Sequence, residues 1–284
     1  MASTEVTRGG RLEGKVAVIT GAGRGVGRSC ATAFAAEGAD LVLVDVPSAT
    51  TPGVPYPLAS ESQLQHTAEE CRKHGVEVLT AAADVRDLAA LEQVRERTVD
   101  RFGQVDALVN NAGVVAPSGR PVHQTSEEEW QLLLDIDLSG AWRMTKLFAP
   151  LFIERRTGSI VNIASTAGLV GYRNFAGYVA AKHGLIGLTK AAALDYAPHR
   201  IRVNAVCPGN IRDEPAVEGR MLSEVARALD VPLAGHEELF TEQQPMNTLV
   251  DPVDVAEAAL WLCCDATRHV TGSTVTVDAG YTVC

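Results

Sequence analysis

Seven short runs of apolar, largely β-branched residues recur along the chain, and helical patterns fill the stretches between most of them. Most runs are continuously apolar rather than alternating, which is typical of strands buried on both faces. Strands that alternate with helices predict an α/β fold built on a doubly wound, seven-stranded parallel sheet. The expected strands are residues 16–20, 41–46, 76–79, 107–110, 160–164, 201–206 and 274–277.

Length and composition favour one globular domain. A chain of 284 residues with 46% hydrophobic content can bury a large core, and single α/β domains often reach this length. We therefore expect residues 1–284 to form a single domain. One helix is predicted by apolar residues spaced three or four apart between Leu91 and Phe102, and another should begin at Asp251-Pro252, an N-cap followed by proline.

Two segments interrupt the alternation of strands and helices. Residues 47–62 hold four prolines and follow the second strand, whereas residues 210–250 separate the sixth strand from the last helix. Both leave the carboxyl ends of strands, where ligands bind in open α/β sheets. Long insertions at such places are usually lids or binding loops. We expect the first to lie near a cofactor and the second to form a lid over a substrate.

The charge and the cysteines exclude several classes of protein. A formal net charge of −10 without a run of basic residues argues against nucleic acid or an anionic membrane as partner. The start of the chain has no apolar signal region, and no stretch approaches the roughly 18 apolar residues of a membrane span. The six scattered cysteines form no CxxC pair, so we expect free thiols in a reducing cytoplasm. No ligand spacing indicates a metal.

A glycine-rich loop, TGAGRGVG at residues 20–27, connects the first strand to the first helix. In this position the glycines allow the backbone to approach a diphosphate at a helix N-terminus, which predicts a dinucleotide site and a Rossmann fold. Asp45 ends the second strand about 20 residues after Gly25, where a carboxylate binds the ribose hydroxyls and repels a 2′-phosphate. This favours NAD over NADP. Arg24 could instead contact a phosphate, and Asp45 could simply begin a turn.

The motifs together resemble the short-chain dehydrogenase/reductase family, and they occur in the family's order along nearly the whole chain. They are TGxxxGxG at residues 20–27, NNAG at 110–113, the serine strand ending at Ser165, YxxxK at 178–182, and Pro208-Gly209. The resemblance implies that Asp84 and Val85 flank the adenine. The cofactor residues expected in all are Gly21, Arg24, Gly25, Val26, Gly27, Asp45, Asp84, Val85, Asn111, Ala112, Gly113, Tyr178, Lys182, Pro208, Gly209 and Ile211.

Three residues have the chemistry needed to move a hydroxyl proton during alcohol oxidation. Tyrosine is a poor base near neutral pH, but an adjacent ammonium and a positive nicotinamide ring favour its phenolate. Tyr178 and Lys182 lie four residues apart, on one helix face, and Ser165 can orient the substrate oxygen. We expect the substrate to contact Ser165, Ala167, Tyr172 and Tyr178. Apolar residues of the second insertion, including Met221 and Leu222, form a helical stripe that suggests an apolar pocket, although such a stripe also suits ordinary core packing.

Two departures from the family pattern affect the site. Asp137 stands where the family usually has an asparagine whose main-chain carbonyl holds a relay water, and it lies on the inward face of its helix. A buried carboxylate must be paired or protonated, and we expect Asp137 to keep the relay role towards Lys182. Asp213 occupies the usual place of a threonine that contacts the cofactor. Either the loop takes another course or Arg212 compensates.

A narrower resemblance is to the carveol-dehydrogenase-like, mycofactocin-coupled members of the family. They share an insertion after the second strand with a Tyr-Pro-Leu-Ala segment, here residues 56–59, and a Met-Asn pair, here residues 246–247. The resemblance implies tightly held NAD that mycofactocin or another carrier reoxidises. The apolar stripe and the acidic second insertion favour a small apolar, terpenoid-like alcohol or ketone as substrate, and the resemblance to the wider family suggests a homotetramer. Two alternatives remain: an NAD(P)H-dependent 3-oxoacyl-thioester ketoreductase, which Asp45 and the acidic second insertion disfavour, and a catalytically inactive dinucleotide sensor.

Overall fold

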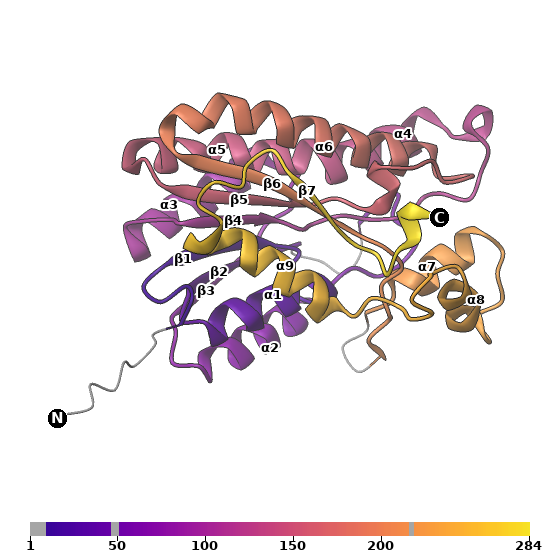
Figure 1. The fold of residues 1–284 in the computed structure, drawn as a ribbon, viewed down its shortest axis with the longest axis horizontal. Helices are drawn as coiled ribbons and strands as arrows, with labels where there is room; N and C mark the ends of the chain where they lie inside the picture. Colours follow the sequence, from indigo (N-terminus) through magenta and orange to yellow (C-terminus); the bar gives the residue numbers. More distant parts are fainter. Residues whose placement is uncertain (1–9, 47–50, 216–218) are drawn as a thin grey trace.

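The computed structural model describes residues 10–46, 51–215 and 219–284. Its centre is a seven-stranded sheet in the order β3-β2-β1-β4-β5-β6-β7, in which all neighbouring strands are parallel (Figure 1). The predicted doubly wound Rossmann architecture is therefore confirmed. The strands are β1 (Val16–Thr20), β2 (Asp40–Asp45), β3 (Val78–Ala82), β4 (Ala107–Asn110), β5 (Gly158–Ile163), β6 (Ile201–Pro208) and β7 (Thr274–Val277).

Helices cover both faces of the sheet. One layer holds α1 (Gly25–Ala36), α2 (Glu61–Arg72) and α9 (Pro252–Cys263). The opposite layer holds α3 (Leu88–Phe102), α5 (Gly140–Arg155) and α6 (Ala176–Tyr196), with α4 (Glu127–Leu134) leading into α5 (Figure 1). Short 3₁₀ turns lie at Val122–Gln124, Thr166–Gly168, Ala197–His199, Asp265–Thr267 and Tyr281–Val283.

Successive strand residues enter two separate cores, one on each face. Ala17 and Ile19 pack with the α1 and α9 side, whereas Val16 and Val18 pack with the α3 and α5 side. Side chains alternate between the faces of a strand, so a strand covered on both faces must be apolar at every position. This explains the continuous apolar runs in the sequence.

The strand predictions hold best in the centre of the sheet and at its carboxyl-terminal edge. The ranges 16–20, 107–110 and 274–277 are reproduced without change, but the prediction of 76–79 is wrong because β3 covers Val78–Ala82. The pairing with β2 decides this register, since Leu41 lies opposite Val78 and Asp45 opposite Ala82. Propensity alone did not indicate an edge strand that ends in three small or polar residues.

The first insertion ends earlier than predicted. Ser60 caps α2 by accepting from the Gln63 amide, and the Gln63 side chain accepts from the Ser60 amide in return. The insertion therefore ends at residue 60 rather than 62, and its residues 47–50 lie outside the described part of the chain. At the last helix, Asp251 and Asp254 form a capping box with Pro252 in the first turn, which confirms the predicted start.

The second insertion carries two short helices, α7 (Met221–Ala228) and α8 (His236–Glu242), which lie beyond the carboxyl ends of the strands (Figure 1). They pack on a small core of their own that contains Leu222, Ala226, Phe240 and Leu249. The predicted helical stripe is thus present. Residues 216–218 of this insertion are not described. Among the described residues, no helix is long and apolar enough to cross a membrane.

Candidate active site

The glycine loop joins β1 to α1 at the carboxyl edge of the sheet. Gly21 and Gly25 have positive φ angles of 65° and 53°, a region that glycine adopts readily. A Cβ on Gly21 would lie 2.8 Å from Asn111 Nδ2, and one on Gly27 would lie 2.0 Å from the Gly21 carbonyl oxygen, whereas Gly25 faces open space. The backbone therefore forms a cradle at the N-terminus of α1, which suits an anionic group such as a diphosphate.

Asp45 lies against this loop at the end of β2. Its two carboxylate oxygens accept hydrogen bonds from the amides of Gly23, at 2.7 Å, and Val46, at 2.8 Å. Burial raises the pKa of Asp45, while these amides and the Arg24 guanidinium oppose the rise. Each oxygen retains capacity for a further hydrogen bond. Asp45, which is predicted to bind ribose hydroxyls, therefore lies beside the glycine loop, and its oxygens can still accept hydrogen bonds.

A single cleft at the carboxyl edge of the sheet collects nearly all the residues predicted from the sequence. Gly27 is the exception, because it packs beneath the glycine loop. The residues that line the cleft are Gly21, Arg24, Gly25, Val26, Asp45, Asp84, Val85, Asn111, Ala112, Gly113, Asp137, Ser165, Ala167, Tyr172, Tyr178, Lys182, Pro208, Gly209 and Ile211.

Ser165, Tyr178 and Lys182 lie together within the cleft, on two elements. Lys182 and Tyr178 occupy one face of α6, and the Lys182 Nζ lies 5.5 Å from the centre of the Tyr178 ring. The Lys182 ammonium donates to the Ile163 carbonyl oxygen at 3.1 Å, which ties it to the end of β5. Ser165 follows β5, and its hydroxyl oxygen accepts from the Ala167 amide at 3.1 Å.

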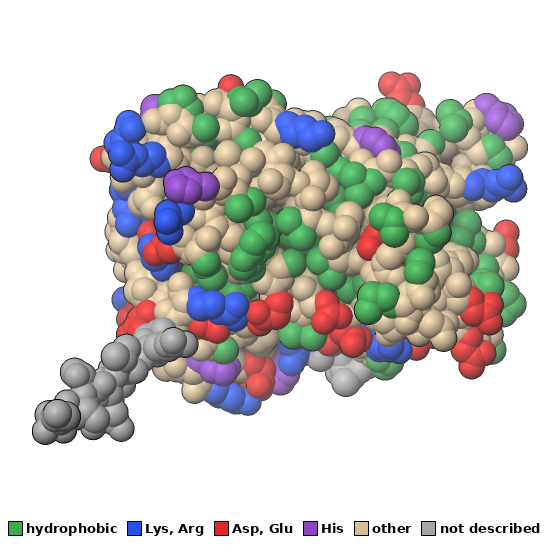
Figure 2. Space-filling view, in the orientation of Figure 1, with side chains coloured by type: hydrophobic (Ala, Val, Ile, Leu, Met, Phe, Trp, Pro, Cys, Tyr) green, Lys and Arg blue, Asp and Glu red, His purple; other side chains and the backbone are tan. Residues whose placement is uncertain are grey.

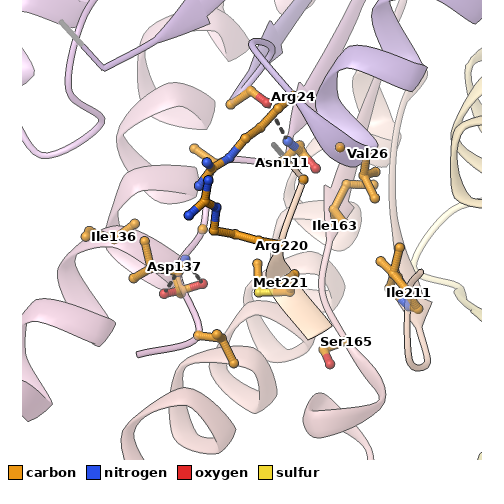
Figure 3. Close-up of a pocket in the computed structure, with 18 of the residues that line it drawn as sticks. Arg24, Val26, Asn111, Ile136, Asp137, Ile163, Ser165, Ile211, Arg220 and Met221 are labelled. Atoms are coloured by element: carbon orange, nitrogen blue, oxygen red, sulfur yellow. Dashed lines mark hydrogen bonds between the residues drawn. The ribbon is translucent and has the colours of Figure 1, made fainter. Parts of the chain in front are cut away.

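Asp137 lies in a π-helical turn, Asp135–Ser139, between α4 and α5. Its carboxylate is only 1% exposed and lies 3.3 Å from the Lys182 Nζ, and it accepts from the Val114 amide at 3.2 Å (Figure 3). A Cβ on Gly113 would come within 2.6 Å of this carboxylate, so the site requires glycine there. The inward orientation expected for Asp137 is therefore present, and the structure pairs its carboxylate with Lys182.

The pKa values around this pair follow from burial and neighbouring charge. Burial raises the pKa of Asp137 to about 6, against the opposing effect of the Lys182 ammonium. For Lys182 burial lowers the pKa, but the Asp137 carboxylate outweighs it and the net shift is upward. Burial also raises the pKa of Tyr178, although Lys182 and the Ser165 hydroxyl oppose it. In the protein alone, the ammonium therefore does not suffice to favour the phenolate.

Tyr172, which the sequence predicted as a substrate contact, is held by two residues that the sequence did not single out. The Tyr172 hydroxyl hydrogen-bonds the Thr166 hydroxyl at 2.8 Å, and its ring stacks on Tyr281 with centroids 5.8 Å apart. Tyr281 follows the last strand and had no motif to mark it. Its contact with Tyr172 is a product of the fold, because the two are more than 100 residues apart.

Asp213 is directed away from the cofactor cradle, which answers the question left by the sequence. Its carboxylate accepts from two amides of the first turn of α7 and from the Ser223 hydroxyl. Arg212 does not compensate it, because its guanidinium pairs with Glu237 at 3.2 Å and Asp251 at 3.0 Å. The loop after β6 thus takes another course, and Asp213 anchors α7.

The described residues hold no group of three His, Cys, Asp or Glu side chains that could bind a metal. All six cysteines are free thiols.

Comparisons with known proteins agree with this geometry. Residues 21–282 match a family model described as enoyl-(acyl carrier protein) reductase. The chain belongs to the short-chain dehydrogenase/reductase family of oxidoreductases.

Its relatives include two carveol dehydrogenases and a reductase. The (−)-trans-carveol dehydrogenase of Rhodococcus erythropolis is 37% identical over 96% of this chain and 99% of its own. The crystal structure of carveol dehydrogenase from Mycobacterium avium in complex with NAD has a TM-score of 0.89 and 36% identity, and the match covers 97% of this chain and 100% of that one. The 3-oxoacyl-[acyl-carrier-protein] reductase of Thermotoga maritima is 33% identical over 96% of this chain and 100% of its own.

Proposed function

We propose that this protein is an NAD-dependent oxidoreductase that interconverts an apolar, terpenoid-like secondary alcohol and its ketone. One observation carries the proposal: Ser165, Tyr178 and Lys182 line the same cleft as the glycine cradle. A proton-transfer group and a dinucleotide site in one cleft are what alcohol oxidation requires. The similarity to carveol dehydrogenases supports the substrate class.

The glycine loop and Asp45 would hold the cofactor. The cradle at the N-terminus of α1 suits the diphosphate, and the Asp45 carboxylate suits the ribose hydroxyls while repelling a 2′-phosphate. Asp84, Val85 and residues 111–113 line the cleft alongside. When bound there, NAD accepts or donates the hydride.

Tyr178 would exchange the hydroxyl proton with the substrate, and Ser165 would hold the substrate oxygen by a hydrogen bond. Because burial raises the pKa of Tyr178, its ionisation depends on the fixed Lys182 ammonium and on any positive charge that ligand binding adds. The Ile163 carbonyl and the Asp137 carboxylate hold that ammonium in place. We assign Asp137 a place in the same proton relay.

The substrate pocket would be closed by the second insertion. Met221, Leu222 and Val225 line the cleft together with Ala167 and Tyr172, so the insertion adds apolar surface next to Ser165. Such a pocket suits a small apolar alcohol. A second candidate is a 3-oxoacyl-thioester ketoreductase, favoured by the Thermotoga maritima relative.

The first insertion supports slow cofactor exchange. The Tyr56 hydroxyl accepts from the Val115 amide at 3.1 Å, and the Arg24 guanidinium donates to the Pro57 carbonyl at 2.8 Å. Ala59 lies so close to the glycine loop that a Cβ on Gly23 would come within 2.7 Å of it. We propose that this fastened segment keeps NAD bound between turnovers, so that a separate carrier such as mycofactocin reoxidises it.

Exposed apolar side chains support a homotetramer. A tetramer with two-fold symmetries needs more than one self-complementary surface. Trp142 on α5 and Leu194 on α6 are exposed on one helical layer, and Val253 and Trp261 on α9 are exposed on the other. Figure 2 shows apolar side chains gathered on the face that carries α9 and β7. The free thiols accord with our expectation of a reducing cytoplasm.

The variant Tyr178→Phe tests the proposed reaction. We expect turnover of a terpenoid alcohol such as carveol, assayed with an artificial electron acceptor, to fall about 10²–10⁴-fold because the proton-transfer group is lost. NAD binding should remain. The matched control is Tyr196→Phe at the far end of α6, which should keep full activity.

Three results would contradict parts of this proposal. Full turnover in Tyr178→Phe would remove Tyr178 from the reaction. Faster reduction of a 3-oxoacyl thioester with NADPH than of any apolar ketone would favour the ketoreductase. Ready loss of NAD during gel filtration, with release of NADH on turnover, would exclude the tightly bound cofactor.

A further inference from the structure

Tyr172 lines the cleft beside the turn that follows Ser165. Thr166 belongs to that turn and lines the cleft as well, and its hydroxyl and the Tyr172 hydroxyl share a hydrogen bond of 2.8 Å. Tyr172 itself lies outside any helix or strand, on the connection between this turn and α6. The hydrogen bond therefore fixes the tip of the Tyr172 side chain, but it does not fix the plane of the ring.

Tyr281 supplies a second contact to this side chain. Its ring stacks on the Tyr172 ring, with centroids 5.8 Å apart and an angle of 9° between the planes. Offset, nearly parallel rings are a favourable arrangement for an aromatic pair. The described residues that line the cleft do not include Tyr281. Tyr281 therefore acts on the cleft through the ring of Tyr172.

The turn that carries Tyr281 is held at several points. The buried Asp278 carboxylate accepts from the amides of Gly280, at 3.0 Å, and Thr282, at 2.9 Å, and from the Thr282 hydroxyl at 2.6 Å. Gly280 has a positive φ angle of 89°, and a Cβ there would lie 3.2 Å from the Pro245 side chain. The turn therefore has little freedom to move the Tyr281 ring elsewhere.

The end of β7, which leads into this turn, is attached to the cofactor side of the cleft. The Gly209 amide donates to the Val277 carbonyl oxygen at 2.9 Å, and Gly209 lines the cleft. A Cβ on Gly209 would lie 2.9 Å from the Asp278 Cα, so the two segments pack in direct contact. Figure 1 shows the C-terminus at the same end of the sheet as α7. The C-terminal turn is thus fixed relative to the cleft.

We propose that Tyr281 is a positioning residue that sets how far the Tyr172 ring extends into the cleft, and that this contact selects secondary alcohols by their width. A flat, monocyclic alcohol fits against the fixed ring, whereas a wider, bridged alcohol collides with it. This inference rests on the proposed oxidation of apolar alcohols and names a residue that limits which of them are accepted. Tyr281 takes no part in proton transfer.

The variant Tyr281→Ala tests the inference with two alcohols, carveol, which has a flat ring, and borneol, which has a bridged bicycle. We expect the ratio of kcat/KM for borneol to kcat/KM for carveol to rise about tenfold, because the Tyr172 ring can move into the vacated space. The change should lie mainly in KM, with kcat for carveol within about threefold of its usual value. NADH affinity, measured by fluorescence, should stay within about twofold, since the cofactor residues are untouched.

Three further variants show whether the effect passes through the stacked rings. Tyr281→Phe keeps the ring and should leave the ratio within about twofold. Val283→Ala is the matched control, because it shortens an exposed side chain of the same turn, and it should leave the ratio unchanged. In a Tyr172→Ala background, adding Tyr281→Ala should alter the ratio by less than about twofold, since the ring on which Tyr281 acts is already gone.

Several outcomes would overturn the inference. An equal loss of kcat/KM for both alcohols in Tyr281→Ala would mean that Tyr281 only stabilises the fold. An equal shift of the ratio in Val283→Ala, or an undiminished shift in the Tyr172→Ala background, would also contradict it. If Tyr281→Ala does not bind NADH, Tyr281→Leu, which keeps bulk without a flat ring, takes its place with the same expectations. The proposed function fails separately, if the unmodified protein oxidises no apolar alcohol.

Discussion

The glycine loop beneath the cleft and the segment that we propose as a lid (the lid segment, residues 219–242) differ in what fixes their positions. Backbone geometry constrains the loop, since Gly21 and Gly25 have positive φ angles and Gly27 lies so close to the Gly21 carbonyl oxygen that no side chain fits. The lid segment is held by side chains, chiefly the Asp213 carboxylate on the first turn of α7 and the ion pairs of Arg212. A backbone cradle has little freedom to change its geometry, whereas side chains that anchor a segment can adopt other rotamers.

The Asp137–Lys182 pair is intermediate between the loop, which the backbone constrains, and the lid segment, which side chains hold. It is a side-chain contact, but both partners are buried, and the Val114 amide and the Ile163 carbonyl hold them as well. Burial makes such a pair more rigid than the exposed ion pairs of Arg212, and it also makes the pair sensitive to protonation. The comparison therefore predicts that a substitution has its largest effect in the loop, a smaller one at the Asp137–Lys182 pair and the smallest in the lid segment. Three substitutions can test this order.

The largest effect is expected from Gly27→Ala in the loop. Its Cβ would lie 2.0 Å from the Gly21 carbonyl oxygen, and neither backbone can move without opening the cradle. We expect NAD affinity, measured by NADH fluorescence, to fall at least about 100-fold, or the protein to lose stability by several kcal/mol. Gly171→Ala, where a Cβ meets nothing within 4 Å, should bind NAD normally. A Gly27→Ala protein with unchanged affinity and stability would show that the loop is not rigid.

An intermediate effect is expected from Asp137→Asn, measured as the change in the free energy of unfolding with pH. The folded-state pKa of Asp137, about 6, lies above the ordinary value of 3.8 for an aspartate, so the folded state binds more protons between those pH values. The contribution of this group to stability therefore falls as the pH rises through that window, and the asparagine variant lacks this fall. The unfolding free energy of the variant relative to the unmodified protein should rise by about 2–3 kcal/mol between pH 4 and pH 7.

Urea unfolding of both proteins at several pH values measures this difference. A constant difference across the window would contradict a raised pKa for Asp137. The comparison does not depend on the absolute cost of the substitution, because the test uses only the change with pH of the difference between the two proteins.

The smallest effect is expected from Asp213→Ala in the lid segment. Removing the carboxylate leaves the first-turn amides of α7 without their acceptor, which costs about 1–2 kcal/mol locally. Hydrogen exchange in α7 should accelerate about tenfold, while the amides of β1 exchange at their usual rate. Equal acceleration in β1 would mean that the lid segment and the sheet open together, and the contrast between loop and lid would then fail.

The sequence predicted the residues that belong to local motifs better than those that only contacts between distant segments bring to the site. The order of glycines, the acid at the end of β2 and the Tyr178–Lys182 spacing are local patterns, and the structure places all three at one cleft. The register of β3 and the end of the first insertion were wrong because strand pairing and a capping box decided them. Tyr281 carried no local signal, and only its contact with Tyr172 marks it.

Asp137 and Asp213 illustrate the same division. Their sequence positions showed that each departs from the family pattern, and the inward face of Asp137 followed from helical periodicity. Whether either acid faces the cofactor did not follow, because it depends on a π-helical turn and on where α7 begins.

By itself, the sequence determined the parallel sheet, the glycine cradle and the residues available for proton transfer, because these follow from periodicity and from spacing along one element. Only the tertiary structure decided that Lys182 meets Asp137, that Asp213 is directed toward α7 and that Tyr281 stacks on Tyr172. Those contacts join residues on different elements, and the packing of the elements, rather than any local preference of the chain, brings them together.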